Sequence, residues 1–296
     1  MDVLKDHLLP EVRAKLDVSD AERIAFCRED RWIAYPQAKQ ILDELDQLVA
    51  YPVTQRPPCR LIVARGDNGK SAIVRQFALR HPMLVTEQGT PDLPVAVINM
   101  PGSPDPSQMW SAILTAELIV HRPSDSASAK RAQVVSILRH NRVRVLVVDE
   151  FNNITNAGKR AADLLSSLRV LSSELNISIV AAGTQAAIHA LSFDPQMRSR
   201  FQPLPVRLWT MDKAYRNFLY TYERLLPLAH PSGLAEPELM PLVFSMAGPA
   251  IGGTVALLKE AAVLAIRSGQ ERITAEVLHG VQANSKDNWD AIAKAV

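Results

Sequence analysis

The run from Arg60 to Ser71, RLIVARGDNGKS, joins an apolar strand directly to a loop and to the start of an amphipathic helix. The loop ends in Gly69, Lys70 and Ser71, the order that closes a phosphate-binding loop of the pattern G-x-x-x-x-G-K-S/T. In such a loop, successive backbone N–H groups curl around phosphate oxygens at the start of a helix. The feature therefore favours an α/β fold with a nucleotide at the end of its first strand.

One position departs from this pattern, because Ala64 stands where the first glycine belongs. Its methyl group is tolerated only if the backbone there keeps a negative φ. Gly66 and Gly69 are expected to supply the conformational freedom of the turn. The residues predicted to hold the nucleotide are Gly66, Asp67, Asn68, Gly69, Lys70, Ser71 and Ala72. An ordinary strand, turn and helix that happens to contain Gly-Lys-Ser is the open alternative.

A second motif lies in RVRVLVVDEFNNI, residues 142–154. Val145 to Val148 form an apolar run typical of a strand that is buried on both faces of a parallel sheet. Asp149 and Glu150 follow at its carboxyl end, where α/β proteins bind ligands. We expect Lys70 to meet the β- and γ-phosphates, Ser71 and Asp149 to hold Mg²⁺, and Glu150 to polarise the attacking water. Acids that simply end a buried strand in solvent are the alternative.

Composition limits the class of protein. The 296 residues are 47% hydrophobic and 22% charged, which suits a globular protein of about two domains. The net charge of +2 creates no global field for nucleic acid, so any DNA contact needs a local basic patch. Two cysteines, expected to be reduced, make no metal knuckle. The N-terminal segment has neither the apolar core nor the cleavage site of a signal peptide, and we expect a cytoplasmic protein without a membrane segment.

The order of the predicted elements indicates a parallel, three-layer α/β domain. Strands are predicted at residues 60–64, 94–99, 145–148 and 177–183, with an extended segment at 204–208 and helices between them at 71–80, 107–119 and 159–175. From Lys213 onward the pattern is helical, with helices predicted at 214–226, 237–246, 254–266 and 274–283. The expected domains are an N-terminal helical segment over 1–57 that packs on the core, the α/β domain over 58–210, and a helical lid over 211–296.

These features together resemble the AAA+ ATPases, and more narrowly the TniB/TnsC family of transposition ATPases. The resemblance rests on RWIAYPQAKQIL, RPPCRLIVARGDNGKSAIVRQF, VLVVDEFNNI, IVAAGTQAA, RSRFQPLPVRLW and GGTVALLKEAA, which recur in family order over about residues 22–283. It implies an ATPase that needs Mg²⁺ and is slow until DNA, oligomerisation or a transposase stimulates it. It also implies a ring or filament of subunits on duplex DNA that marks a target and recruits a DDE transposase, often with a TniQ-like partner.

The resemblance also implies roles for residues outside the two motifs. Thr184, at the end of the fourth strand, matches a polar sensor, and a hydroxyl there can bond water or γ-phosphate; a core or capping threonine is the alternative. Arg198 or Arg200 matches the arginine finger that reaches a neighbouring subunit's γ-phosphate, although either can be a solvated charge. The aromatic segment before the ATPase core matches the adenine pocket through Trp32, Ile33 and Tyr35, with plain packing as the alternative.

The chain departs from the family in two places, at Ala64 and in the helix after Gly252 and Gly253, where Thr254 stands instead of a sensor arginine and Lys259 is the nearest base. Candidate contacts to DNA phosphates are the two basic pairs Lys130 with Arg131 and Lys159 with Arg160, which can equally be solvated helix starts. Two other functions stay open: a nucleotide-gated binding module with little hydrolysis, and a different AAA+ remodeller or loader.

Overall fold

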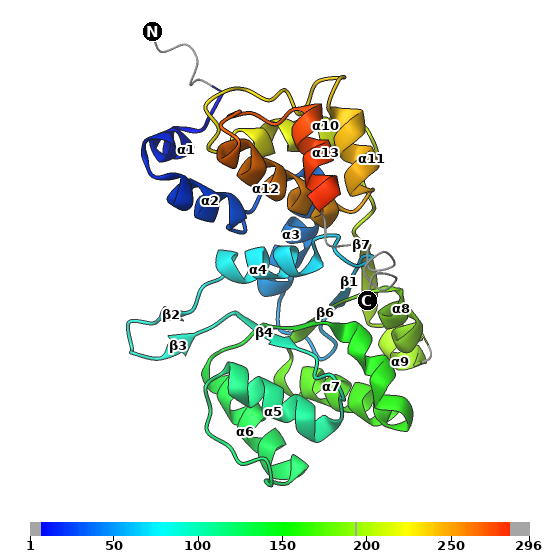
Figure 1. Cartoon of the computed structure of the whole chain (residues 1–296). Coiled ribbons are helices and arrows are strands. Elements are labelled where there is room, and N and C mark those ends of the chain that lie inside the picture. Colours follow the sequence, from blue (N-terminus) through cyan, green and yellow to red (C-terminus); the bar gives the residue numbers. More distant parts are fainter. Residues whose placement is uncertain (1–6, 193, 285–296) are drawn as a thin grey trace. The chain divides into compact units, whose positions relative to one another are not determined.

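The computed structural model describes residues 7–192 and 194–284 and divides into two compact units (Figure 1). The sheet unit runs continuously from Pro36 to Arg207. The helical unit is assembled from both ends of the sequence, Met1–Tyr35 and Leu208–Val296. Each unit has its own buried core.

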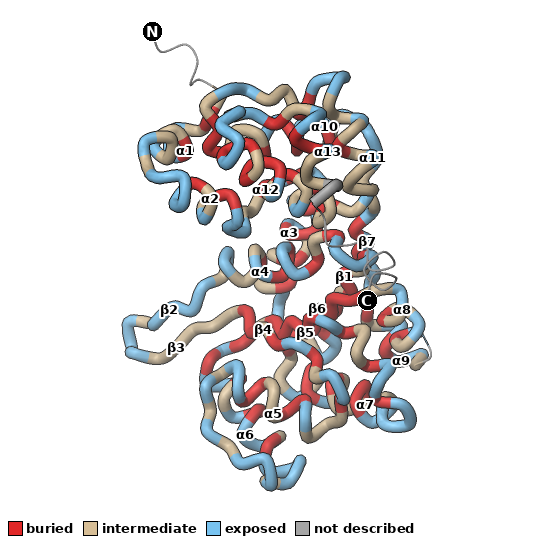
Figure 2. Tube along the Cα trace, viewed as in Figure 1, coloured by how far each residue is buried: buried red, intermediate tan, exposed pale blue. Residues whose placement is uncertain are grey.

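The sheet unit contains a five-stranded parallel sheet in the order β4-β5-β6-β1-β7. Its strands are β1 (Cys59–Val63), β4 (Val95–Asn99), β5 (Val145–Asp149), β6 (Ser178–Gly183) and β7 (Phe201–Pro205). Every residue of β5 and β6 is buried, as continuous apolar runs predict for the middle of a parallel sheet (Figure 2). The order brings the carboxyl ends of β5, β6 and β1 to one edge.

Helices cover both faces of this sheet. The helices and the 3-10 helix of the unit are α3 (Pro36–Val49), α4 (Lys70–Arg80), α5 (Pro106–Ala116), α6 (Ala127–His140), η3 (Phe151–Arg160), α7 (Ala161–Leu175), α8 (Gln185–Ser192) and α9 (Pro195–Arg198). Leu61, Leu146 and Ile179 point to one face and share a core with α5, α6, α7 and α8. α4 packs on β4, β5 and β6 without entering that core, and α3 packs on α4. The expected three-layer α/β arrangement is confirmed.

Some connections differ from the expected pattern. A short hairpin of β2 (Leu84–Val85) and β3 (Pro91–Asp92) follows α4, and neither strand was expected. The predicted helix over 159–175 begins at Ala161, after a 3-10 segment that Gly158 interrupts with φ 54°. β7 starts three residues before the expected segment because Phe201 pairs with Cys59 at the start of β1.

Over residues 7–35 and 208–284, the helical unit joins three short N-terminal helices to four C-terminal ones. They are α1 (Pro10–Arg13), η2 (Ala14–Asp17), α2 (Asp20–Arg28), α10 (Lys213–Glu223), α11 (Met240–Ala247), α12 (Ile251–Arg267) and α13 (Ala275–Asn284). Ser19 and Glu22 form a capping box at the start of α2. Cys27 and Ile33 are buried in one core with Tyr215 and Leu258. The all-helical C-terminal region expected from the sequence is present.

The boundaries of the units differ from the expected ones. Residues 1–57 were expected to pack as one segment on the α/β core, but the chain divides after Tyr35. α2 packs on α12, and its Arg23 donates to Glu271, which follows α12 (Nη1 to Oε1, 2.9 Å). In contrast, Asp46 of α3 accepts a hydrogen bond from Arg80 at the end of α4. The helical pattern of residues 1–57 did not indicate that α2 would pack on α12 and α3 on α4.

Gly253 explains how α11 and α12 approach each other. Both glycines were expected to precede the helix, but α12 begins at Ile251 and includes them in its first turn. A Cβ atom added at Gly253 would lie 2.3 Å from the carbonyl oxygen of Ala247. The last residue of α11 therefore contacts the backbone of α12 directly, which only glycine allows.

In the described part of the chain, no single helix is long and apolar enough to cross a bilayer. α11 and α12 pass that test only as a pair, and the pair is bent by 113°.

Candidate nucleotide site

The predicted phosphate loop begins at the carboxyl end of β1. Ala64 is 5% exposed, and its N–H donates to the carbonyl oxygen of Gly183 at the end of β6 (3.1 Å). Ala64 is not among the residues with positive φ, so its methyl group is compatible with the turn as expected. The substitution therefore leaves the strand exit in an ordinary conformation.

Of the two glycines expected to give the turn its conformational freedom, only Gly69 has a positive φ. Gly69 has φ 80° and Asp67 has φ 54°, both in the left-handed region. Gly66 has no positive φ, and a Cβ atom added there would meet no atom within 4 Å. The prediction that Gly66 supplies the freedom of the loop is wrong for this conformation, because an aspartate takes the left-handed position.

Asn68 fixes the loop from inside. Its side chain is buried, and Nδ2 donates to the carbonyl oxygens of Val206 (3.0 Å) and Arg207 (3.1 Å), just after β7. The sequence predicted Asn68 only as a member of the loop. Its acceptors lie more than 130 positions later in the chain, so no local pattern indicated this clamp.

Lys70 lies where the phosphate loop ends and α4 begins. α4 begins at Lys70, with Gly69 as its N-cap, and the following Ser71 and Ala72 are exposed in the first turn. The Lys70 side chain is buried, and its Nζ donates to the carbonyl oxygen of Arg65 (3.2 Å). Lysine and free helix N–H groups together suit an anion at this end of α4.

Asp149 and Glu150 end β5 in different environments. Asp149 is 5% exposed, and its Oδ1 accepts the N–H of Glu150 (2.8 Å). Glu150 is exposed and adopts the left-handed conformation, with φ 52°. This turn separates a buried carboxylate from an accessible one, as a metal ligand and a general base require.

Asn152 joins Glu150 to the next strand. Its Nδ2 donates to Oε2 of Glu150 (3.2 Å), and its Oδ1 is buried without a hydrogen-bond partner in the described residues. A Cβ atom added at Gly183 would lie 3.2 Å from the backbone nitrogen of Asn152. This close approach brings Thr184, half-buried at the end of β6, to the region of Glu150. Asn152 was not predicted as a site residue.

The donor set fits MgATP. Lys70 and Asp149 are buried charged groups, and within residues 7–192 and 194–284 neither is recorded in an ion pair. The phosphates would satisfy the lysine, and the cation would satisfy the carboxylate and the hydroxyl of Ser71. Asn152 Oδ1 adds an unsatisfied acceptor near Glu150 that a water molecule could bond.

The two predicted finger residues lie away from this edge, before the amino end of β7. Arg198 is exposed at the end of α9. Arg200 is half-buried, and its Nη1 donates to Oγ of Ser173 on α7 (3.1 Å). Neither residue is therefore a ligand for the loop that follows the carboxyl end of β1 in the same subunit.

The predicted adenine residues belong to the helical unit. Ile33 and Tyr35 are each 8% exposed, and the Tyr35 ring packs on Trp209 (ring centroids 4.9 Å apart). Burial raises the pKa of Tyr35 to about 12, and its hydroxyl has no hydrogen-bond partner in the described residues. Trp32 is half-buried, 6.3 Å from Tyr35. These contacts are those of a packed aromatic cluster, and the adenine contact stays a prediction.

The four predicted DNA contacts differ in accessibility. Lys130 is 3% exposed and donates to Oγ of Ser107 and to the carbonyl oxygen of Pro123, so its ammonium is used inside the fold. Arg131 pairs with Glu174. Lys159 and Arg160 are exposed after the break at Gly158, and Arg160 pairs with Asp105 (3.0 Å). The pair at the end of η3 is thus the accessible one.

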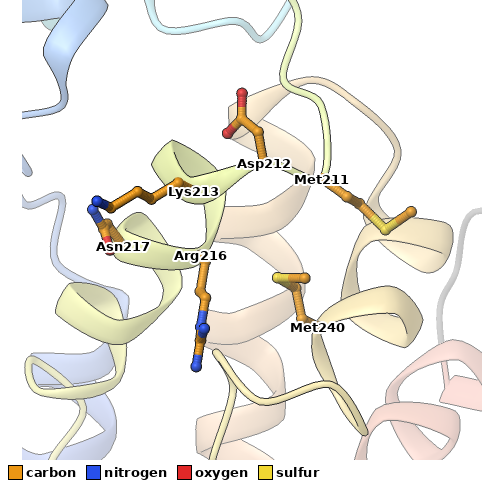
Figure 3. Close-up of a pocket in the computed structure, with 6 residues that line it drawn as sticks. All are labelled: Met211, Asp212, Lys213, Arg216, Asn217 and Met240. Carbon is orange, nitrogen blue, oxygen red and sulfur yellow. The ribbon is translucent and has the colours of Figure 1, made fainter.

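The helical unit holds an open pocket at the start of α10 (Figure 3). Figure 3 shows Met211 and Met240 on one side and Lys213 and Asn217 on the other. Asp212 caps α10 by accepting the N–H groups of Tyr215 (3.0 Å) and Ala214, and these bonds lower the pKa of its carboxyl. No residue predicted for nucleotide or DNA lines this pocket.

The fold is similar to that of several solved structures. The DNA complex of Orc1 from Aeropyrum pernix is 20% identical with a TM-score of 0.65, over 88% of this chain and 69% of that one. Orc2 from Aeropyrum pernix, in ADPNP and ADP complexes, is 16% identical with a TM-score of 0.63, over 91% and 73%. The RuvB branch migration motor of Thermotoga maritima is 15% identical with a TM-score of 0.54, over 87% and 73%. At these identities the likeness concerns the AAA+ fold.

Among curated proteins, none matches the chain. The family described as "Bacterial TniB protein" matches residues 23–211, which include the phosphate loop, both acids of β5, Thr184 and the two predicted finger arginines. The match covers well over half of the sequence and agrees with the resemblance seen in the motifs. The chain belongs to the TniB family of transposition-associated AAA+ ATPases.

Proposed function

We propose that this protein is an ATP-dependent, DNA-binding AAA+ regulator of DNA transposition. In the proposal, subunits assemble on duplex DNA as a ring or filament, mark the target and recruit a DDE transposase, together with a TniQ-like partner. The observation that carries it is the edge of the parallel sheet where Lys70 follows β1 and where Asp149 and Glu150 stand at the end of β5, with β6 between these two strands, in a chain of the TniB family. The roles of individual residues follow from this edge.

The loop residues would bind and orient the nucleotide. Lys70 and the free N–H groups of α4 face the phosphates, while Ser71 and Asp149 hold the cation. Mg²⁺, when bound, neutralises charge on the β- and γ-phosphates. Glu150 orients and polarises water for in-line attack, and the Thr184 hydroxyl bonds that water or the γ-phosphate.

A slow basal rate is supported by the contact between Asn152 and Glu150. The carboxylate accepts a hydrogen bond from the asparagine amide (3.2 Å), so the oxygen Oε2 of Glu150 is already engaged by a donor other than water. Hydrolysis then requires Glu150 to exchange this partner for water. An arginine from a neighbouring subunit, Arg198 or Arg200, would supply the remaining charge stabilisation, so the rate would depend on assembly.

DNA binding would use phosphates rather than bases. Lys159 and Arg160 are exposed, and they follow the strand that carries the two acids. Contacts of this kind are salt-dependent and show little sequence preference. Replacing Lys159 by alanine should reduce the salt dependence of binding by about one counterion.

The proposal is tested by assembly and turnover in one preparation. Electron microscopy of the protein with duplex DNA and an ATP analogue should show rings or filaments. ATP hydrolysis should fall about 100-fold or more in Glu150→Gln while nucleotide binding is retained, whereas Lys70→Ala should lose binding. A protein that stays monomeric with ATP, Mg²⁺ and DNA together refutes the proposal.

The contact of Asn152 with Glu150 also favours a second candidate, a nucleotide-gated binding module with little hydrolysis. Under this alternative the wild type and Glu150→Gln would turn over ATP at equal, near-zero rates while both bind it. Asn152→Ala separates the two readings, because freeing Glu150 should change the rate only in an enzyme.

A further inference from the structure

Three arginines from separate parts of the sheet unit lie together, and we call them the arginine cluster: Arg56, Arg169 and Arg200. Arg56 precedes β1, and its Nη2 donates to Oγ of Ser199, the neighbour of Arg200 in sequence (3.3 Å). Arg200 donates in turn to Oγ of Ser173 on α7 (3.1 Å). Arg169 lies one helical turn before Ser173 and so on the same face of α7. Arg56 and Arg169 are both close enough to Arg200 for their charges to act on it.

The arginine cluster lacks negative charge of its own. Within the described residues, none of its members is recorded in an ion pair, and the third, Arg169, donates to Oγ of Ser166 (3.2 Å). Other arginines of the protein form ion pairs with carboxylates, as Arg23 does with Glu271 and Arg80 with Asp46. Like charges held together without an anion repel one another, so the fold maintains an unfavourable arrangement here.

Arg200 is the most constrained member. Its Nε is buried and has no hydrogen-bond partner in the described residues. Burial lowers the pKa of Arg200, and the charges of Arg56 and Arg169 lower it further. A guanidinium nevertheless stays protonated at neutral pH, so Arg200 presents a full charge and an unused donor.

These properties suit a phosphoryl group as ligand. Guanidinium groups bind phosphate oxygens with paired N–H donors, and three of them match a terminal phosphate, which carries more than one negative charge. A DNA phosphate carries one charge and would use exposed side chains rather than a half-buried Arg200. The observations therefore favour the end of a nucleotide's phosphate chain.

That nucleotide cannot be the one bound by the same subunit. The arginine cluster lies where Phe201 pairs with Cys59, at the amino ends of β7 and β1. The phosphate loop leaves the opposite end of β1, about 16 Å away at roughly 3.3 Å per residue. A phosphate that reaches the cluster must come with another molecule.

We propose that Arg56 and Arg169 act with Arg200 as a three-arginine site for the terminal phosphate of a nucleotide bound by a second copy of the chain. The inference rests on the proposed function, which assigns this contact to a single residue, Arg198 or Arg200. It adds two residues, Arg56 and Arg169, to which the family resemblance assigns no role. The site binds and orients the phosphate, and the subunit that holds the nucleotide provides the remaining groups.

The test mixes two inactive variants. One is Lys70→Ala, which lacks nucleotide but keeps the arginine cluster; the other is the double variant Arg56→Ala, Arg169→Ala, which keeps its own phosphate loop. Each is assayed alone and mixed for ATP hydrolysis with duplex DNA, and thermal unfolding checks that both are folded. The mixture should hydrolyse ATP well above the sum of its parts, because the first variant supplies arginines to the nucleotide of the second.

Single variants give the size of each contribution. Arg56→Ala and Arg169→Ala should each lower the assembled rate about 10- to 100-fold, the effect of one charged hydrogen bond, without weakening ATP binding by the isolated subunit. Free guanidinium should restore part of the rate. The control is Arg139→Ala, an exposed arginine on α6, which should leave the rate unchanged.

The outcomes separate the two proposals. If the wild type hydrolyses ATP and Arg200→Ala abolishes this while Arg56→Ala and Arg169→Ala remain fully active, the three-arginine site is refuted and the proposed function stands. A mixture no more active than its parts, with both variants folded, also refutes the site. A wild type that neither assembles nor hydrolyses ATP refutes both.

Discussion

Asn68 allows a direct test of how the phosphate loop is held in place. In Asn68→Ala the carbonyl oxygens of Val206 and Arg207 lose two donors, at 3.0 and 3.1 Å. Each bond contributes about 0.5 to 1.5 kcal/mol, and a buried carbonyl left without a partner costs about 1 to 3 kcal/mol. We expect a loss of about 2 to 3 kcal/mol in the free energy of unfolding.

The assay combines denaturant unfolding with ATP affinity. The midpoint should fall while the slope with denaturant stays constant, because the same surface is exposed on unfolding. ATP affinity should also fall, since the loop must then be ordered by the nucleotide itself.

Asn68→Asp provides the sharper comparison. It keeps the shape of the side chain but places a carboxylate oxygen against two carbonyl oxygens, so it should destabilise the protein more than alanine does. An aspartate variant as stable as the wild type, or more stable than the alanine variant, would refute the clamp.

Three further changes test other parts of the fold. Ala64→Gly removes a buried methyl group and loosens the strand exit, which should cost about 1 to 2 kcal/mol in denaturant unfolding and change ATP turnover only modestly; abolished binding would contradict the account of the turn. Gly253→Ala places a Cβ atom 2.3 Å from the carbonyl oxygen of Ala247 and should cost about 3 kcal/mol, whereas Gly102→Ala, where a Cβ atom meets nothing within 4 Å, should unfold as the wild type does. Burial favours a higher pKa for Glu271, but the bonds that its carboxylate accepts from Arg23 and from the backbone outweigh burial and lower the pKa below the ordinary 4.5. The stabilisation that Glu271 provides is therefore complete above pH 4.5 and is lost as the pH falls through the lowered pKa. In Glu271→Gln the unfolding temperature should depend less on pH in the acid range, and an unchanged pH dependence would count against the pairing with Arg23.

The central strands were predictable because their signal is local. The four apolar residues that begin at Val145 and the apolar run that ends at Gly183 are typical of strands buried inside a sheet. The predicted ends of β5 and β6 therefore agree with the observed ends to within one residue. The acids after β5 and the loop after β1 then followed from the parallel arrangement. The left-handed conformation of Asp67 and Glu150 did not follow, because neither residue type requires it.

The side-chain contacts that could not be predicted are those made with residues far away in the sequence. Asn68 can hold the phosphate loop only in the folded protein, where the residues after β7 lie beside the loop and accept its hydrogen bonds. Lys130, at a helix start, had the pattern of a solvated charge, yet its ammonium is taken by Ser107 and Pro123. Arg56 and Arg169 stand far apart in sequence, and no motif assigned either of them a role, so only packing could bring them to Arg200.

The division of the chain into a continuous sheet unit and a helical unit built from both ends has a consequence for synthesis. Arg23 meets Glu271, 248 positions later, and at about 5 to 20 residues per second this partner appears roughly 12 to 50 s after Arg23 is made. The complete sheet unit leaves the ribosome in that interval and can fold first. The helical unit must wait with Cys27 and Ile33 uncovered, so its early segment is the part of a nascent chain that most needs protection from aggregation.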